Sequence, residues 1–204
     1  MKRNSYMTVG LTVLTLVVIG VAVYFVFFNQ DDLPVIQEPT PFTLTNALNE
    51  ETYNSDNGKV KIVTFFYTNC PDICPLTLRD FMKLEKELKA ENLYGSDVEL
   101  VAITVDPKVD TVPVLKNYGE AFQAEPEGWK MLTGDQVDID RITRQLQFYY
   151  SKANSGLVTH ATTMYVIDRH HDVRAVAQMA TAGDEPVDIE SIMEDVKVLA
   201  NEKE

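Results

Sequence analysis

Cysteine is scarce in this sequence of 204 residues, which contains only Cys70 and Cys74, separated by three residues. A disulfide framework uses more cysteines and ties distant segments together, so a small fold held by several disulfides is excluded. Hydrophobic residues make up 45% of the chain, which is enough apolar material for a sizeable core without such bridges. The close cysteine pair therefore indicates redox chemistry or metal binding.

Positive charge is also in short supply. Lysine and arginine together number 18, against 31 aspartates and glutamates, so the formal net charge is −13. An acidic surface repels nucleic acid and anionic lipid headgroups, so nucleic acid is not an expected partner. Such a surface suits cations or basic partner proteins, and it also simply promotes solubility.

An uncharged run at residues 7–28 stands apart from the rest of the chain. Its length of about 22 residues matches a helix that crosses a bilayer. Lys2 and Arg3 precede the run and two aspartates follow it, so the positive-inside tendency leaves residues 1–6 in the cytoplasm. A cleaved signal peptide is the alternative, but aromatic residues occupy the place where small residues should precede the cleavage site. We expect a single-pass signal-anchor in the cytoplasmic membrane, with the globular domain on the extracytoplasmic side.

Residues 29–41 carry three prolines and mixed charge, which predicts an extended linker. In the remaining domain, residues 42–204, strand signals from β-branched and aromatic runs alternate with apolar residues at helical spacing. The predicted strands are 59–67, 98–105, 162–168 and 173–178, and the predicted helices are 75–90, 111–122, 138–148 and 185–201. This order implies an α/β domain whose mixed sheet is covered by helices on both faces.

The two cysteines lie where the first strong strand meets its helix, in the segment Phe65–Leu78. Proline is favoured at the first helical position, so Pro75 predicts the helix start and Cys74 the N-cap, with Cys70 in the preceding loop. The partial positive charge of the helix N-terminus then stabilises a thiolate at Cys74. Two thiolates about one turn apart suit copper(I), which prefers sulfur, and the same spacing permits a disulfide. A structural disulfide, a dithiol oxidoreductase and a metal site all remain open from the pair alone.

Four segments, in order along the chain, resemble the SCO/SenC family. The family's copper-site motif, C-P-D-x-C-P after an aromatic strand, is matched by YTNCPDICPLTL. Its D-P-x-x-D-T-P-x-x-L-x-x-Y stretch is matched by TVDPKVDTVPVLKNY, in which Val112 lies between the usual Thr and Pro. GWKMLTG and VTHATTMYVID resemble its W-x-x-L-T-G segment and the strand that carries its copper-binding histidine. The resemblance covers roughly residues 35–200. Two positions depart from the pattern, because Thr159 stands where the family often has an acidic residue and DRHHD replaces a turn that often carries Pro and Gly.

The resemblance implies a thioredoxin-like fold that binds one copper ion, as copper(I) or copper(II), through Cys70, Cys74 and His160. Imidazole accommodates copper(II), so this set of ligands can serve both oxidation states. We expect His160 to open its strand and to face the cysteine loop. Many thioredoxin-like oxidoreductases place a cis-proline directly before a Thr-Thr pair beside the cysteines, whereas Ala161 occupies that position here. The missing proline favours a metal site over disulfide exchange.

The other two histidines and the nearby carboxylates are expected to have structural roles. His170 and His171 lie in a predicted turn between two strands, where we expect them to be exposed and solvated. Asp72, between the cysteines, is expected to influence the electrostatics of the loop, because carboxylates suit harder ions than copper(I). Asp106 and Asp110 follow the second strand, and Asp110 is predicted to cap the next helix.

The resemblance further implies a copper metallochaperone that assists assembly of the CuA centre of cytochrome c oxidase. Its expected partners are the copper-site subunit of that oxidase and another copper chaperone or a thiol reductant. The alternative is a thiol–disulfide oxidoreductase that keeps the oxidase cysteines reduced, with Cys70 and Cys74 as its redox-active pair. A thiol peroxidase is a third hypothesis, and it needs a positive charge beside one cysteine, for which Arg79 is the nearby candidate.

Overall fold

The computed structural model of the protein describes residues 11–21, 33–153, 158–178 and 186–202. The chain divides into two units, Met1–Asp32 and Leu33–Glu204. In the first unit, residues 11–21 form a helix with exposed side chains. None of the helices in the described residues is both long and apolar enough to cross a bilayer. The predicted membrane-spanning run 7–28 lies partly outside the described residues.

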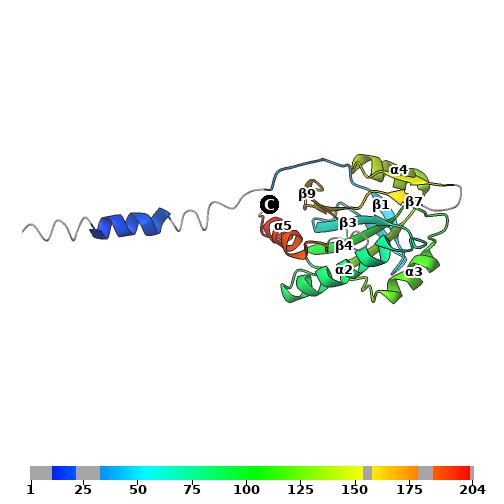
Figure 1. The fold of residues 1–204 in the computed structure, drawn as a ribbon, viewed down its shortest axis with the longest axis horizontal. Coiled ribbons are helices and arrows are strands. Elements are labelled where there is room, and N and C mark those ends of the chain that lie inside the picture. Colours follow the sequence, from blue (N-terminus) through cyan, green and yellow to red (C-terminus); the bar gives the residue numbers. More distant parts are fainter. Residues whose placement is uncertain (1–10, 22–32, 154–157, 179–185, 203–204) are drawn as a thin grey trace, which may run out of the picture. The chain divides into compact units, whose positions relative to one another are not determined.

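A seven-stranded mixed sheet forms the centre of the second unit (Figure 1). The strand order is β2-β1-β5-β4-β3-β8-β9, in which β3, β4 and β5 are parallel and the other pairings are antiparallel. The four strands predicted from the sequence are confirmed as β3, β4, β8 and β9. The strand bounds are β1 Thr43–Asn46, β2 Thr52–Asn54, β3 Val60–Phe66, β4 Val98–Thr104, β5 Trp129–Thr133, β8 Thr163–Ile167 and β9 Val173–Gln178.

Helices cover both faces of this sheet, as the sequence predicts. α2, α3 and α5 lie on one face, where α2 packs against α5, and α4 lies on the other face (Figure 1). The helix bounds are α2 Ile73–Ala90, α3 Val112–Ala121, α4 Gln136–Gln145 and α5 Ile189–Asn201. The mixed α/β architecture is therefore confirmed, with each helix within four residues of its predicted bounds.

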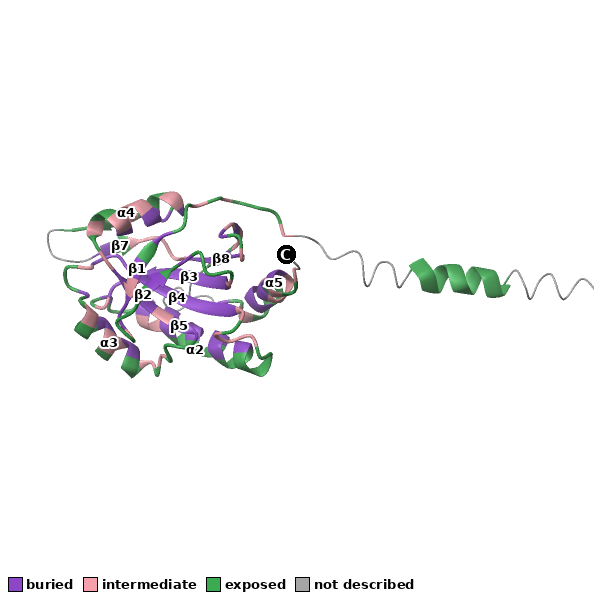
Figure 2. Ribbon diagram, turned by 180° about the vertical axis from the view of Figure 1, so that it is seen from behind, coloured by how far each residue is buried: buried purple, intermediate pink, exposed green. Residues whose placement is uncertain are grey.

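The central strands β3 and β4 are buried along their whole length (Figure 2). Both are nearly continuous apolar runs, as expected for parallel strands with helices on both sides. The buried face of α2 packs onto this sheet through side chains such as Leu78 and Phe81, which are 0% exposed. Burying a side chain of this size contributes about 1.5–3 kcal/mol, so the junction between β3 and α2 is firmly held.

The chain from residue 33 onward lies against the sheet. In this part of the predicted linker, the backbone N–H of Ile36 donates to the Val173 carbonyl at 2.8 Å, and the N–H of Val173 donates to the Gln37 carbonyl at 2.9 Å. The Arg174 guanidinium also donates to the Leu33 carbonyl. These contacts attach the segment that enters the globular unit to the edge strand β9.

The carboxyl ends of β3 and β4 lie side by side, because the two strands are parallel and in register. Open α/β sheets bind their ligands at this edge, in the loops that follow the strands. A separate two-stranded ribbon, formed by β6 (Tyr150–Lys152) and β7 (Val158–His160), does not belong to the seven-stranded sheet. This ribbon carries the histidine that the sequence assigns to the site.

Candidate metal centre

The loop between β3 and α2 brings the two cysteines together. α2 begins at Ile73 and its N-cap is Asp72, whose Oδ1 accepts a hydrogen bond from the Ile73 N–H at 2.6 Å. The predicted start at Pro75, with Cys74 as N-cap, is therefore wrong by two residues. Aspartate is a much better N-cap than cysteine. Pro75 is tolerated as the third helical residue because the first four N–H groups of a helix have no partner within it.

Both cysteine side chains are buried and neither forms a disulfide, since Cys70 is 6% and Cys74 1% exposed. The backbone N–H of Cys74, in the first turn of α2, points at Cys70 Sγ at 3.4 Å. Hydrogen bonding from the Cys74 thiol, followed by that from the His160 imidazole, lowers the pKa of Cys70 to about 3 despite its burial. Its hydrogen bond to Cys70, together with burial, raises the pKa of Cys74. The thiolate is therefore at Cys70 and not at Cys74, where we expected it from the sequence.

The ring of His160 lies beside the two sulfur atoms. His160 is the last residue of β7, three residues before β8, and does not open the strand as predicted. Its Nδ1 lies 2.7 Å from the Ala161 carbonyl and donates to it, so Nε2 carries the lone pair when the ring is neutral and donates to a sulfur when the ring is protonated. Nε2 lies 3.7 Å from Cys74 Sγ. Burial alone would lower the pKa of His160, but hydrogen bonding to Cys70 and to the Ala161 carbonyl raises it overall.

Two aromatic rings fix the orientation of this imidazole. Phe148 stacks on His160 with ring centroids 6.0 Å apart, and Tyr67 meets it edge-on at the same centroid distance. Sequence reasoning missed both residues. The aromatic character of the segments around them was visible in the sequence, but contacts across the fold were not.

The sulfur atoms of Cys70 and Cys74 and a ring nitrogen of His160 all lie within 4.8 Å of one another. Bonds from a metal ion to thiolate sulfur and imidazole nitrogen are about 2.0–2.3 Å long, so two donors on one ion are at most about 4.6 Å apart. Three donors spread evenly around one ion lie about 4 Å apart, so the three atoms need to approach by less than about 1 Å to share an ion. Two sulfurs and one imidazole bind copper and zinc better than they bind harder ions, which prefer oxygen ligands.

A buried carboxylate holds the cysteine loop in place. Asp110 is 0% exposed, and it accepts hydrogen bonds from the backbone N–H of Thr68 at 3.2 Å and from the hydroxyls of Thr68 and Thr104. Burial raises the pKa of Asp110, although these hydrogen bonds act against the shift. The prediction that Asp110 caps the next helix is wrong, because the N-cap of α3 is Thr111. Asp110 instead links Thr104, at the end of β4, to Thr68, which lies two residues before Cys70.

The remaining candidates lie apart from the sulfur atoms. His170 is exposed as predicted, but His171 is only 2% exposed, with a positive φ of 76° that places its ring edge-on against Phe42. The prediction of a solvated His171 is therefore wrong. Asp72 Oδ1 lies 3.9 Å from Cys70 Sγ, close enough to influence its charge. Arg79 lies on the exposed face of α2, opposite to the face that carries Cys74. It therefore does not provide the positive charge beside a cysteine that the peroxidase hypothesis needs.

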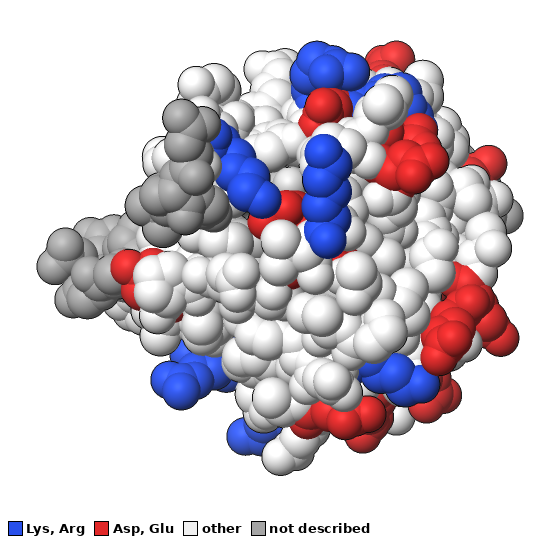
Figure 3. All heavy atoms as spheres, turned by 90° about the vertical axis from the view of Figure 1, so that its right-hand side faces the viewer, with Lys and Arg blue, Asp and Glu red and all other residues white. Residues whose placement is uncertain are grey.

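The protein surface near the site is only partly open. Asn69, Pro71 and Asp72 are exposed, so the loop lies at the surface as expected, while its two sulfur atoms point inward. Figure 3 shows the end of the globular unit that carries β7, α3 and α4. An uncharged area occupies the middle of this face, with most charged side chains around it. A partner can therefore approach this area without strong like-charge repulsion.

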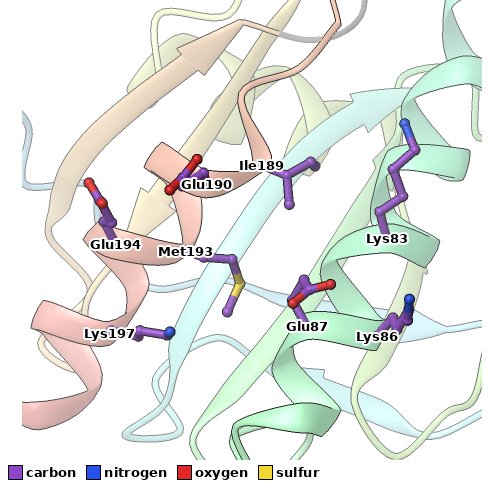
Figure 4. Close-up of a pocket in the computed structure, with 8 residues that line it drawn as sticks. All are labelled: Lys83, Lys86, Glu87, Ile189, Glu190, Met193, Glu194 and Lys197. Atoms are coloured by element: carbon purple, nitrogen blue, oxygen red, sulfur yellow. The ribbon is translucent and has the colours of Figure 1, made fainter.

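A groove of about 520 Å³ between α2 and α5 lies elsewhere (Figure 4). The sulfur of Met193 lies at its floor, and lysines and glutamates of both helices, such as Lys86 and Glu194, surround it. The groove contains none of the three predicted metal ligands. The chemistry of the site is therefore confined to the cysteine loop and the β6–β7 ribbon.

Known proteins resemble the chain over most of the globular unit. The SCO1/SenC family profile matches residues 31–197. An SCO2-like protein of Rickettsia prowazekii is 33% identical over 138 residues, which cover 64% of this chain and 64% of that protein. The chain thus spans less than two thirds of the length of this relative.

Two solved structures share the fold. Arabidopsis thaliana ScoI with copper bound is 28% identical, has a TM-score of 0.65 and matches 81% of this chain and 99% of its own. BsSco, a member of the Sco family of cytochrome c oxidase assembly proteins in which a disulfide switch was identified, is 28% identical, has a TM-score of 0.70 and matches 85% of this chain and 98% of its own. The mixed, thioredoxin-like arrangement of sheet and helices agrees with both structures. The chain belongs to the SCO1/SenC family.

Proposed function

We propose that this protein binds one copper ion through Cys70 Sγ, Cys74 Sγ and His160 Nε2 and assists assembly of the CuA centre of cytochrome c oxidase. The observation that carries this proposal is the convergence of the three donor atoms within 4.8 Å. The donors are soft sulfur and borderline imidazole, which suit copper in both of its oxidation states. The copper-bound plant relative has the same fold and supports the choice of metal.

The protonation states of the free site favour uptake of a cation. Cys70 presents a thiolate, and His160 presents the lone pair of Nε2, because Nδ1 donates to the Ala161 carbonyl. Cys74 keeps its proton until the ion binds and then releases it, because a metal ligand must be deprotonated. Copper binding therefore releases the Cys74 proton, and also the Nε2 proton wherever His160 is protonated, and it exchanges the hydrogen bond between the sulfurs for two metal–sulfur bonds.

Delivery proceeds by ligand exchange with a partner. The cysteines of the copper-site subunit of the oxidase displace Cys70 and Cys74 one after the other, and the copper ion passes to the partner. The uncharged area at this end of the globular unit supports close approach of the two proteins (Figure 3). BsSco belongs to a family of cytochrome c oxidase assembly proteins, which supports the choice of partner.

The anchor that we propose at residues 7–28 keeps the globular domain near membrane-bound partners. Confinement to the membrane raises the effective concentration of the domain at the oxidase without adding any contact. Residues 29–32 then separate the membrane from the globular unit, since the chain contacts β9 from Leu33 onward.

Titration of the reduced full-length chain with copper(II) tests the proposal. We expect a sulfur-to-copper charge-transfer band that saturates at one equivalent, together with a matching EPR signal. His160→Ala should change both signals and Cys70→Ser should abolish the band, whereas the exposed His170 provides a matched control in His170→Ala. A wild-type chain without the band, or a His160→Ala variant that matches wild type, would contradict the proposal.

A thiol–disulfide oxidoreductase is the second candidate function, and the Cys70 thiolate favours it. In that reaction the Cys70 thiolate attacks a partner disulfide, and Cys74 then resolves the mixed disulfide. The domain gains one disulfide and loses two electrons to the partner, whose two sulfurs take up the Cys74 proton and one proton from water to become thiols. Catalytic reduction of a disulfide peptide by the full chain with excess thiol reductant, without copper binding, would establish this function instead. Copper binding without such turnover would leave the metallochaperone as the function.

A further inference from the structure

His160 is carried by the β6–β7 ribbon and not by the main sheet. In the ribbon, Tyr150 pairs with His160 and Lys152 pairs with Val158. Residues directly opposite each other, and residues two apart on a strand, project to the same face. Lys152 and His160 therefore share one face of the ribbon, while Ser151 and Thr159 project from the other face and are exposed.

Lys152 attaches this face to the loop that follows β4. Its Nζ donates to Asp106 Oδ2 at 2.6 Å, with the Lys152 side chain 40% and the Asp106 side chain 5% exposed. The backbone of Asp106 is fixed, because its N–H donates to Thr104 Oγ1 at 3.0 Å and its carbonyl accepts from the Asp110 N–H at 2.9 Å. The ribbon is thus tied to the same loop that holds the cysteine segment through Asp110.

The two ends of the ribbon are held by different forces. Before β6, the Phe148 ring packs on Phe65 of β3 with centroids 4.4 Å apart, which fixes the end nearest His160. The other end is held by burial of Val158, which is 5% exposed, and by the ion pair of Lys152 with Asp106. Exposed ion pairs contribute little, but a buried carboxylate that loses its partner keeps an uncompensated charge. Breaking this pair should therefore change how the ribbon lies on the sheet.

We propose that Lys152 and Asp106 are a positioning pair that orients the β6–β7 ribbon, so that His160 Nε2 faces the two sulfur atoms. This inference rests on the proposed copper binding. Copper(I) is held mainly by the two thiolates, whereas copper(II) gains from the imidazole. The ion pair therefore raises the affinity for copper(II) and leaves the affinity for copper(I) nearly unchanged.

Lysine variants of the full-length chain separate this role from a general effect of charge. Substitution of a residue that orients a metal ligand typically lowers metal affinity about 10–100-fold. Lys152→Met should therefore weaken copper(II) binding by about that factor. It should also alter the nitrogen hyperfine structure of the EPR signal. Copper(I) affinity, measured by competition with a chelator, should change less than about threefold. Lys152→Arg should retain wild-type values, and so should Lys108→Met, which removes an exposed lysine two residues after Asp106.

Three results would overturn the inference. These are wild-type copper(II) affinity in Lys152→Met, an equal loss for both oxidation states, and an equal effect of Lys108→Met. Amide hydrogen exchange in the copper-free chain tests the ion pair independently of the proposed function. Exchange at Thr159 and Ala161, whose N–H groups face β6 in the antiparallel ladder, should be faster in Lys152→Met and Lys152→Gln than in wild type, and unchanged rates would contradict the positioning role. A wild-type chain that binds no copper would reject the proposed function, while the exchange data would still decide the role of the pair.

Discussion

At the scale of the residue, two hydrogen positions define the chemistry of the site. The Cys74 thiol donates to Cys70, and the Nδ1–H of His160 donates to the Ala161 carbonyl. As a result, the Cys70 sulfur and the Nε2 of the neutral His160 ring both present lone pairs to the same small volume. A site with these donors is prepared for a cation before the cation arrives.

The pH dependence of alkylation should reveal the Cys70 thiolate. Because the folded pKa of Cys70 is about 3, well below the value of about 8.5 for an unperturbed cysteine, its negative charge persists as the pH falls toward 3. We expect iodoacetamide to modify Cys70 of the reduced native chain at rates that are nearly flat between pH 5 and 7. In urea-denatured chain the rate should fall about tenfold per pH unit. Parallel profiles for native and denatured chain, read by mass spectrometry of the labelled peptide, would contradict the assignment.

Removing the Asp110 carboxylate should destabilise the fold. Asp110→Ala leaves the N–H and hydroxyl of Thr68 and the hydroxyl of Thr104 without their acceptor. We expect the free energy of unfolding to fall by about 1–3 kcal/mol, measured by urea denaturation of the copper-free chain. Asp135→Ala is the control, because Asp135 is exposed and its side chain makes no capping hydrogen bond. Equal midpoints for the two variants would reject this role of Asp110.

The sequence motif identifies the residues of the site better than their roles. Cys70, Cys74 and His160 are marked by residue type and by resemblance to the family. Which sulfur bears the negative charge depends on where the Cys74 N–H points, and this direction follows from a helix that starts at Ile73 with Asp72 as its N-cap. The hydrogen bonds between Asp110 and Thr68 join residues 42 positions apart, so no local sequence pattern predicts them.

At the scale of the element, long and continuously apolar segments are predictable and short ones are not. β3 and β4 are buried on both faces, so each appears in the sequence as a nearly unbroken apolar run. β6 and β7 contain three residues each, and β6 has no buried residue, so neither is long or apolar enough to predict a strand. The ribbon that carries His160 therefore became visible only through its pairing in the structure.

Helix α2 offers a matched pair of neighbouring substitutions. Leu78 is 0% exposed on the core side of the helix, and the adjacent Arg79 is exposed. We expect Leu78→Ala to lower the free energy of unfolding by about 2–5 kcal/mol, because it removes buried surface and leaves a cavity. Arg79→Ala should change it by less than about 0.5 kcal/mol and should leave cysteine alkylation unchanged. A large effect of Arg79→Ala on the alkylation rate would revive the peroxidase hypothesis.

At the scale of the whole molecule, a metal-binding globular unit follows an uncharged N-terminal run. The globular unit includes the chain from Leu33 onward, because residues 33–37 contact β9. The acidic net charge of −13 keeps this unit soluble and weakens contact with anionic lipid. The proposed association with a membrane therefore rests on residues 7–28.

A protease site inserted between Asp31 and Asp32 tests the anchor and its orientation together. Protease added to intact spheroplasts should release the globular unit into the medium, because the proposed orientation places it outside the cytoplasmic membrane. The chain without the inserted site should stay in the membrane fraction under the same treatment. Cleavage only after lysis of the spheroplasts would reverse the orientation, and a soluble uncleaved chain would reject the anchor.

X-ray absorption at the copper edge tests the central claim most directly, because it counts the sulfur and nitrogen neighbours of the metal. The full-length chain loaded with one equivalent of copper should show two sulfur neighbours and one imidazole nitrogen, and His160→Ala should remove the imidazole contribution alone. Copper coordinated only by nitrogen and oxygen, or an imidazole contribution that survives in His160→Ala, would contradict the account.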